Sequence, residues 1–81
     1  MTKKSIAVQF GYVLRELRTE AGLSQEAFAD KCGLHRTYIG SIERGEKNIT
    51  IETADKIAKA LGLSLSALFI RFDVIADSHD A

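Results

Sequence analysis

The stretch HRTYIGSIERG, residues 35–45, is predicted to form a short helix with Gly40 in its middle. A glycine in a helix interior costs roughly 1 kcal/mol relative to alanine, so the segment gives up helix propensity. On a helical wheel at ~100° per residue, Tyr38, Ile39 and Ile42 lie on one side. The opposite arc holds Arg36, Thr37, Gly40, Ser41 and Arg44. A merely solvated face is expected to carry better helix formers such as Glu, Lys and Gln, which indicates that something approaches this arc closely.

The residues just before this stretch predict a second short helix over residues 25–31. Ser24 is a favourable N-cap for it. The connection CGLH, residues 32–35, contains Gly33, which supplies the positive backbone φ that a tight turn needs. His35 then occupies the N-cap position of the next helix. Two short helices joined by a three- or four-residue turn with glycine form the helix-turn-helix pattern.

Apolar periodicity extends this pair to an all-α chain of five helices. The other three are predicted over residues 5–21, after Thr50 and after Ser64. Glycines that end helices follow these segments at Gly22, Gly33, Gly45 and Gly62. The residues expected to face the core are Ile6, Phe10, Val13, Leu14, Leu17, Ala21, Phe28, Cys32, Leu34, Ile39, Ile42, Ile51, Ala54, Ile57, Ala58 and Leu61. Residues 69–75, FIRFDVI, also alternate as a strand would, but we prefer a helix because the chain offers no second strand to pair with it.

The length predicts a single domain over residues 1–81, with a core at 6–69 and a dimerisation extension and tail at 70–81. A domain of this size buries only about 60% of its unfolded surface, so dimerisation would add burial. The 11 basic and 11 acidic residues balance, which argues against a sequence-independent nucleic-acid coat. The middle of the chain is nevertheless locally basic. One cysteine and no apolar run of membrane length predict a cytoplasmic protein without disulfides.

The polar arc of the residue 36–44 helix suits the major groove of DNA, which admits a helix and displays donors, acceptors and thymine methyl groups. Arg36 is the candidate for a bidentate bond to guanine. Thr37 and Ser41 are candidates for base edges or phosphates, and Gly40 lets the backbone come close. The candidates for holding the sugar-phosphate backbone are Gln25, His35, Lys47, Asn48 and Thr50.

The segment GLSQEAFADKCGLHRTYIGSIERGEKNITIETADKIAKALGLSLSALF, residues 22–69, resembles the lambda-repressor-like (Cro/repressor, XRE-type) helix-turn-helix family. The resemblance covers about residues 6–69. Within that family, RTYIGSIERGEKNITI is similar to the restriction-modification controller proteins. The resemblance implies a five-helix DNA-binding domain and a homodimeric transcriptional regulator of its own operon, acting as activator and autorepressor on a near-palindromic operator.

The resemblance also implies roles for single residues. Arg36 and Thr37 would read bases with Ser41 and Arg44 beside them, and Tyr38 would lie at the groove edge. Arg18 would form a partly buried ion pair with Glu43. The last helix would form the dimer interface through Leu65, Leu68, Phe69, Phe72 and Ile75. In activating relatives, acidic residues of the second helix contact RNA polymerase, which makes Glu26 and Asp30 candidates here.

Other functions stay open at this point. The alternatives are a phage-type or other repressor of the same family, or a protein-interaction module without a DNA role. An enzyme is not expected, because the sequence offers no nucleophile–base pair, no phosphate loop and no metal set. Cys32 and His35 are only two potential ligands, whereas a structural zinc site needs four, so no metal or cofactor is expected.

Overall fold

The structure, a computed structural model, describes residues 5–79. The ends of the predicted domain, residues 1–4 and 80–81, lie outside this part. The described chain is all-α, as predicted, and contains five helices and no strand. These are α1 (Ile6–Glu20), α2 (Gln25–Cys32), α3 (Arg36–Glu43), α4 (Ile51–Ala60) and α5 (Leu65–His79). The strand alternative for residues 69–75 is wrong, because α5 runs through them without interruption.

Side-chain caps begin the helices where the sequence predicts. The hydroxyl oxygen of Ser24 accepts from the backbone N–H of Ala27 at 3.0 Å, and Thr50 Oγ1 accepts from Thr53 at 3.1 Å. His35 caps α3 through Nδ1, which accepts from the Thr37 N–H at 3.1 Å. Each cap satisfies an amide that the first turn of a helix leaves unpaired.

The turn between α2 and α3 begins at a left-handed residue. Gly33 has φ 71° and ψ 31° at the C-cap of α2, a conformation that glycine adopts without steric cost. Its N–H bonds back to the carbonyls of Ala29 and Asp30. The next helix therefore starts in a new direction only three residues after α2 ends.

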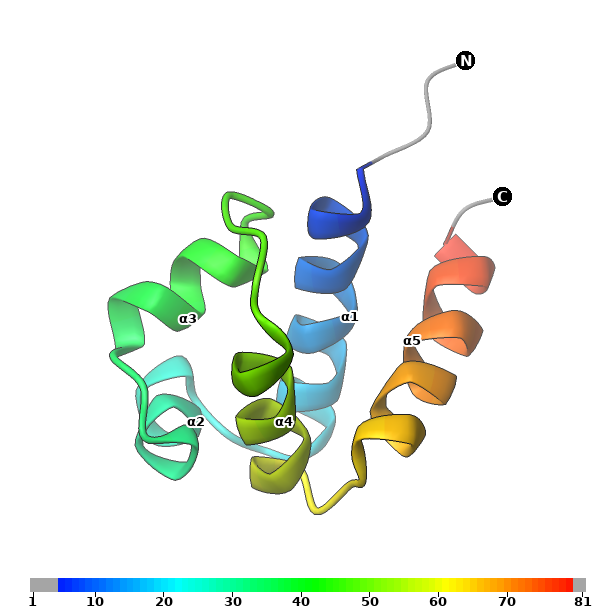
Figure 1. Cartoon of the computed structure of the whole chain (residues 1–81). Coiled ribbons are helices and arrows are strands. Elements are labelled where there is room, and N and C mark those ends of the chain that lie inside the picture. Colours follow the sequence, from blue (N-terminus) through cyan, green and yellow to red (C-terminus); the bar gives the residue numbers. More distant parts are fainter. Residues whose placement is uncertain (1–4, 80–81) are drawn as a thin grey trace.

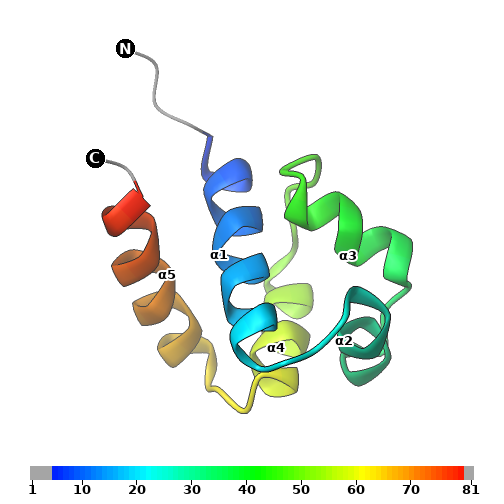
Figure 2. The same ribbon diagram turned by 180° about the vertical axis from the view of Figure 1, so that it is seen from behind.

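Helix α1 lies in the middle of the molecule, with α3 on one side and α5 on the other (Figures 1 and 2). Helix α5 returns antiparallel beside α1, and α2 and α4 close the domain near the last turn of α1 (Figures 1 and 2). The core lies between these helices. It consists of Phe10, Val13, Leu14, Leu17, Phe28, Ala29, Cys32, Ile39, Ile42, Ala54, Ile57, Ala58 and Leu68.

Three residues expected in the core are exposed instead: Ile6, Ala21 and Ile51. Ile6 and Ile51 are the first residues of α1 and α4, and Ala21 is the C-cap of α1. The apolar stripe of each helix is therefore longer than the part that neighbouring helices cover. Leu34 and Leu61 are half-buried against the core.

Helices α1 and α3 touch through backbone at Gly11. A Cβ atom placed there would overlap the carbonyl oxygen of Ile42 and lie 2.7 Å from that of Glu43. Only glycine allows this separation. The close approach fixes the carboxyl-terminal end of α3 against the middle of α1, which positions the helix that the sequence analysis singles out.

Candidate nucleic-acid interface

Helix α3 has one buried and one exposed side. Ile39 and Ile42 are fully buried in the core. Arg36, Thr37 and Arg44 are exposed to solvent. Helix α3 lies on the opposite side of α1 from α5, at an edge of the molecule (Figures 1 and 2). A partner of extended shape can therefore reach the exposed side of α3 without displacing another helix.

Ser41 does not belong to the exposed side, and its predicted place there is wrong. Its residue surface is 6% exposed, and its hydroxyl donates to the carbonyl oxygen of Tyr38 at 2.8 Å. Ser41 stood at the edge of the predicted arc, next to Tyr38 and Ile42. The other helices enclose a wider part of α3 than the wheel implied, and a serine with a backbone acceptor is buried there without cost in unsatisfied hydrogen bonds.

Gly40 is covered by two polar side chains. A Cβ atom on Gly40 would lie 3.2 Å from Nη1 of Arg44 and 3.6 Å from Oε1 of Gln25. No backbone or core atom approaches that closely, so the protein's own packing does not demand a glycine. Arg44 and Gln25, predicted independently as base-reading and phosphate-holding residues, thus lie beside one another over the middle of α3.

Tyr38 is half-buried and packs against the core from the side of α3 away from Gly40. It lies at the border between the enclosed and the exposed parts of the helix. Its role at the edge of a DNA groove stays a prediction.

Two exposed arginines, Arg36 at the start of α3 and Arg44 at its C-cap, donate to carboxylates. Arg36 Nη1 lies 3.2 Å from Glu26 Oε2 on α2, and Arg44 Nε lies 2.9 Å from Glu46 Oε2 in the following loop. A second bond joins Arg44 Nη2 to Glu46 Oε1 at 3.2 Å. This hydrogen bonding raises the pKa of Arg44 and lowers the pKa of the Glu46 carboxyl, so both groups are charged at neutral pH.

A third arginine–glutamate pair is buried beneath α3. Arg18 of α1 donates from Nε to Glu43 Oε2 at 2.6 Å and from Nη2 to Oε1 at 3.1 Å. Its Nη1 also donates to the carbonyl oxygen of Leu23 at 2.8 Å. The structure therefore contains the ion pair that the family resemblance implies. Gln25 Nε2 donates to the same carboxylate at 3.0 Å, so Glu43 joins α1, α2 and α3.

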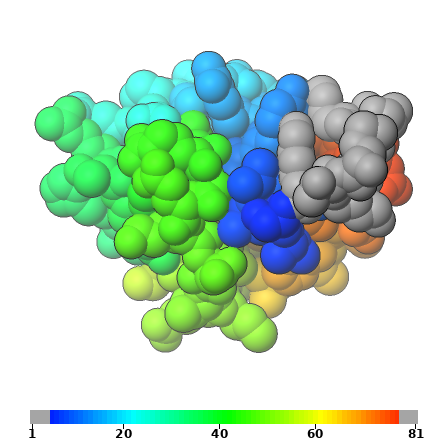
Figure 3. Space-filling model, turned by 90° about the horizontal axis from the view of Figure 1, so that it is seen from above, coloured from blue at the N-terminus to red at the C-terminus, as the bar shows by residue number. Residues whose placement is uncertain are grey.

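The remaining candidates for phosphate contacts surround α3 at both ends. His35 is exposed at its start, and because Nδ1 accepts a backbone hydrogen bond, the neutral ring carries its proton on Nε2. Lys47, Asn48 and Thr50 are exposed in the loop between α3 and α4. Figure 3 shows this loop region, in green, beside the amino-terminal end of α1, in blue.

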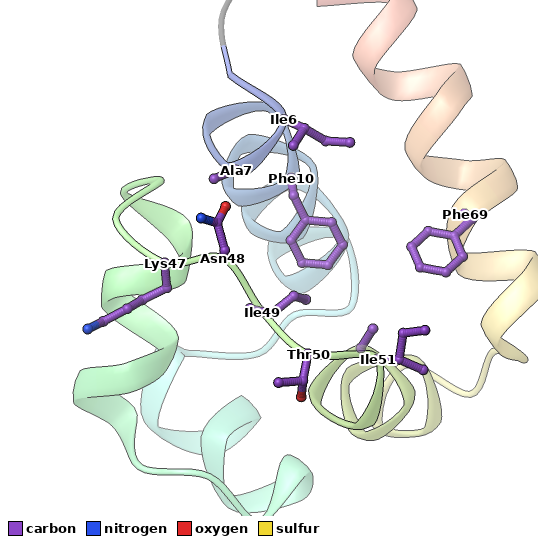
Figure 4. A pocket seen from close by; sticks show the side chains of 10 residues that line it. Ile6, Ala7, Phe10, Lys47, Asn48, Ile49, Thr50, Ile51 and Phe69 are labelled. Carbon is purple, nitrogen blue, oxygen red and sulfur yellow. The ribbon is translucent and has the colours of Figure 1, made fainter.

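An apolar pocket of about 200 Å³ lies behind this loop. Figure 4 shows Phe10 and Phe69 facing it from α1 and α5, while the Lys47 side chain points away. The pocket is lined by Ile6, Ala7, Phe10, Lys47, Asn48, Ile49, Thr50, Ile51, Ala54 and Phe69. Sequence reasoning did not find it, because it assigned Ile6 and Ile51 to the core.

Helix α5 divides its apolar residues between the core and the surface. Leu68 is 1% exposed within one chain, so its predicted place in a dimer interface is wrong: α1 and α4 already enclose it. Phe72 is half-buried, with its ring centroid 6.1 Å from that of Phe10. Leu65 and Ile75 are likewise half-buried. The exposed residues are Phe69 and two that the prediction did not include, Ile70 and Val74.

Neither a metal-ligand cluster nor a membrane-spanning helix occurs among the described residues. Among residues 5–79, no group of three His, Cys, Asp or Glu residues could hold a metal ion. None of the described helices has the length and apolar character needed to cross a bilayer. Cys32 is a buried free cysteine, and burial raises the pKa of its thiol to about 11.

Comparison with known proteins connects this geometry to a family. A family model described as "Helix-turn-helix" matches residues 14–68. The control protein C.BamHI of Bacillus amyloliquefaciens is 45% identical over 60 residues, which cover 73% of this chain and 74% of that protein.

Two solved structures are also similar. The restriction-modification controller protein C.AhdI from Aeromonas hydrophila is 45% identical, with a TM-score of 0.76 over 82% of this chain and 100% of that one. The controller protein C.Esp1396I, solved as a tetramer in complex with its natural 35-base-pair operator, is 32% identical, with a TM-score of 0.82 over 91% of this chain and 97% of that one.

Proposed function

Because the chain belongs to the helix-turn-helix family whose model matches residues 14–68, we propose that it is a sequence-specific, double-stranded-DNA-binding regulator of transcription. Its similarity to C.BamHI and C.AhdI makes it a regulator of the restriction-modification controller type. The observation that carries the proposal is the exposed side of α3, where Arg36, Thr37 and Arg44 face solvent on a helix whose other side is fixed in the core. Such a regulator needs no catalytic activity and is expected in the cytoplasm with the DNA.

In the proposed complex, α3 enters the major groove. Arg36 donates to O6 and N7 of a guanine, and Thr37 and Arg44 contact neighbouring base edges. Tyr38 lies at the groove edge. Ser41 has no part in this contact, since its hydroxyl is buried and bonded to backbone. Gly40 leaves room for the Arg44 and Gln25 side chains over the middle of the helix.

Backbone contacts would surround this reading surface and fix its register. The proposed phosphate-holding residues are Gln25, His35, Lys47, Asn48 and Thr50. Gln25 lies at the amino-terminal end of α2, where unpaired amides favour an anion, and its side chain is held by Glu43. Contacts of this kind orient a protein on duplex DNA without reading its sequence.

The proposed regulator is a homodimer, with a second copy on an apolar patch that we define as Ile6, Ile51, Phe69, Ile70 and Val74. All five are exposed in the single chain, and Phe69 continues into the apolar pocket beside α1 and α4. Phe69, Ile70 and Val74 belong to α5, which lies across α1 from α3, and Ile6 and Ile51 border the pocket that Phe69 enters. A two-fold pair can therefore be built without covering either reading surface, and its operator would carry half-sites ~34 Å apart.

Replacing Ile70 and Val74 with aspartate tests this patch. Each substitution puts a charge where two apolar surfaces would meet, so the double variant should sediment as a monomer at micromolar concentration while keeping its helical circular dichroism. The control is Asp73→Asn on the same helix, which should leave the dimer intact. A wild-type chain that sediments as a monomer, or a variant that remains dimeric, contradicts the proposed interface.

For RNA polymerase, the proposed contact is the exposed acidic side of α2. Glu26 and Asp30 are both exposed there. Glu26 is paired with Arg36, which leaves Asp30 as the better candidate. An Asp30→Asn variant that binds DNA normally but loses activation in transcription in vitro would support this contact.

Selection of bound sequences from random duplex DNA tests the function directly. We expect enrichment of a near-palindrome with half-sites about one helical turn apart. Affinity should fall steeply with salt, because phosphate neutralisation releases counterions. Absence of any enriched sequence would refute the proposed function. Enrichment of a single unsymmetrical site would refute the dimer alone.

A further inference from the structure

Each exposed arginine of α3 is matched by one nearby carboxylate. Arg36 donates to Glu26 and Arg44 donates to Glu46, from different elements and at opposite ends of the helix. The two pairs share no residue. Their side chains are between 55% and 69% exposed, so the pairs are not imposed by burial.

The carboxylates present the arginines with negatively charged hydrogen-bond acceptors, as DNA phosphates do. A guanidinium binds carboxylate and phosphate with the same planar, forked geometry. The Arg44–Glu46 pair uses this geometry in full, with two bonds to the two carboxylate oxygens. The lowered pKa of Glu46 keeps this acceptor ionised at neutral pH. DNA must therefore compete with Glu46 for two donors of Arg44 and with Glu26 for the Nη1 donor of Arg36.

We propose that Glu26 and Glu46 act as built-in competitors of DNA for Arg36 and Arg44, and that each lowers the affinity of the protein for duplex DNA. The proposal rests on the DNA-binding function argued above. A bond to guanine or phosphate replaces an existing bond to carboxylate, so the net gain from each arginine is the difference between the two. The competition also adds repulsion between the released carboxylate and the approaching phosphates.

The exposed pairs are weak enough to be displaced. Exposed ion pairs typically contribute little because water and salt screen them and because ordering two long side chains costs entropy. We therefore expect each competitor to reduce DNA affinity by a factor of about two to five, not to block binding. The operator can therefore still bind both arginines. Random DNA makes fewer matched contacts with them, so the arginines add less to its binding free energy.

The experiment measures equilibrium binding of Glu26→Gln and Glu46→Gln to the selected operator and to a random-sequence duplex. Glutamine keeps the size of the side chain and removes the charge. Glu20→Gln is the matched control: Glu20 also pairs with an arginine, Arg71, at 2.9 Å, but on the side of α1 toward α5. It changes the net charge equally without touching α3.

We expect the two α3-side variants to bind both duplexes about two- to fivefold more tightly at low salt, whereas Glu20→Gln changes affinity much less. The difference should shrink as salt is added, because screening weakens the pair and the repulsion together. Equal effects of all three variants would overturn the proposal, since net charge alone would then explain them. Weaker operator binding by Glu26→Gln would also overturn it, because Glu26 would then orient Arg36 for DNA.

A double-mutant comparison separates competition from long-range repulsion. If Glu26 competes for Arg36, then Arg36→Ala weakens DNA binding more in the Glu26→Gln background than in the wild type. Equal effects in both backgrounds would mean that Glu26 acts only as a distant charge, and would overturn the proposal. A wild type that binds no duplex at all refutes the proposed function, and this inference falls with it.

Discussion

Arg18 and Arg36 each donate to a glutamate, but the two pairs lie at different ends of α3: Arg36 is its first residue and Glu43 is its last. The Arg18 and Glu43 side chains are 10% and 4% exposed, and those of Arg36 and Glu26 are 67% and 69% exposed. Three N–H groups of Arg18 donate hydrogen bonds inside the protein. Arg36 has one recorded bond and donors left over. Burial therefore commits Arg18 to holding the helices together and leaves Arg36 available to a partner.

The largest effect expected from this difference is on stability. Arg18→Met should lower the free energy of unfolding by about 3–5 kcal/mol, because Glu43 is left buried and without its cation. Urea denaturation followed by circular dichroism measures the loss. The matched control, Arg36→Met, should change the free energy of unfolding by less than about 0.5 kcal/mol, as exposed substitutions do. Equal destabilisation by the two variants would remove the distinction between the pairs.

The second prediction concerns operator binding, for which Arg36 should matter more than Arg18. Arg36→Ala should weaken operator binding by about 1–3 kcal/mol, the usual value of a bidentate contact to a base, and should relax the preference at one base pair. Fluorescence anisotropy with the selected operator and with single-base variants measures both. Unchanged operator affinity and unchanged preference would mean that Arg36 is an ordinary surface residue.

The smallest expected effect is a change in stability at Gly40 of α3, and Gly11 of α1 provides the contrast. Gly40→Ala should stabilise the fold by up to about 1 kcal/mol, because alanine is the better helix former and the Arg44 side chain can move aside. The same variant should bind the operator less well, since the methyl group then displaces the Arg44 and Gln25 side chains that are proposed to contact DNA. Gly11→Ala should instead destabilise the fold by about 1–3 kcal/mol, because backbone carbonyls already occupy the space.

Thermal unfolding and operator titration of both variants check this contrast. Stabilisation together with weaker binding identifies Gly40 as a functional glycine. A Gly40→Ala variant that keeps full operator affinity would show that DNA binding does not depend on how Arg44 and Gln25 lie over Gly40.

The sequence predicted α2, α3 and the turn between them closely, because local chemistry determines them. Ser24 and His35 cap their helices as expected, and Gly33 has the positive φ that the turn requires. Such signals depend on a few neighbouring residues. They do not depend on how the helices pack.

Depth within the fold was harder to predict. Ser41 and Leu68 were both placed on surfaces, yet neighbouring helices enclose them. A wheel gives the direction of a side chain but not how far the adjacent helices extend around it. For the same reason the exposure of Ile6 and Ile51 was not predicted. An apolar residue in the first turn of a helix fits the helical period as well as one in the middle does.

Gly11 was missed altogether, although its sequence position carried a signal. A glycine inside a predicted helix, with no turn nearby, usually marks a close approach of another backbone. Only the structure shows which helix approaches. Gly11 of α1 meets the backbone of α3 at Ile42, which is far away along the chain.

The burial of Cys32 has a consequence for how such a regulator responds to its surroundings. A thiol with a pKa of about 11 is almost entirely protonated at neutral pH, and only the thiolate reacts readily with peroxides and disulfides. With this pKa and 6% of its surface exposed, Cys32 presents little thiolate to oxidants or glutathione at neutral pH. We therefore expect no oxidative control of the proposed regulator through this cysteine.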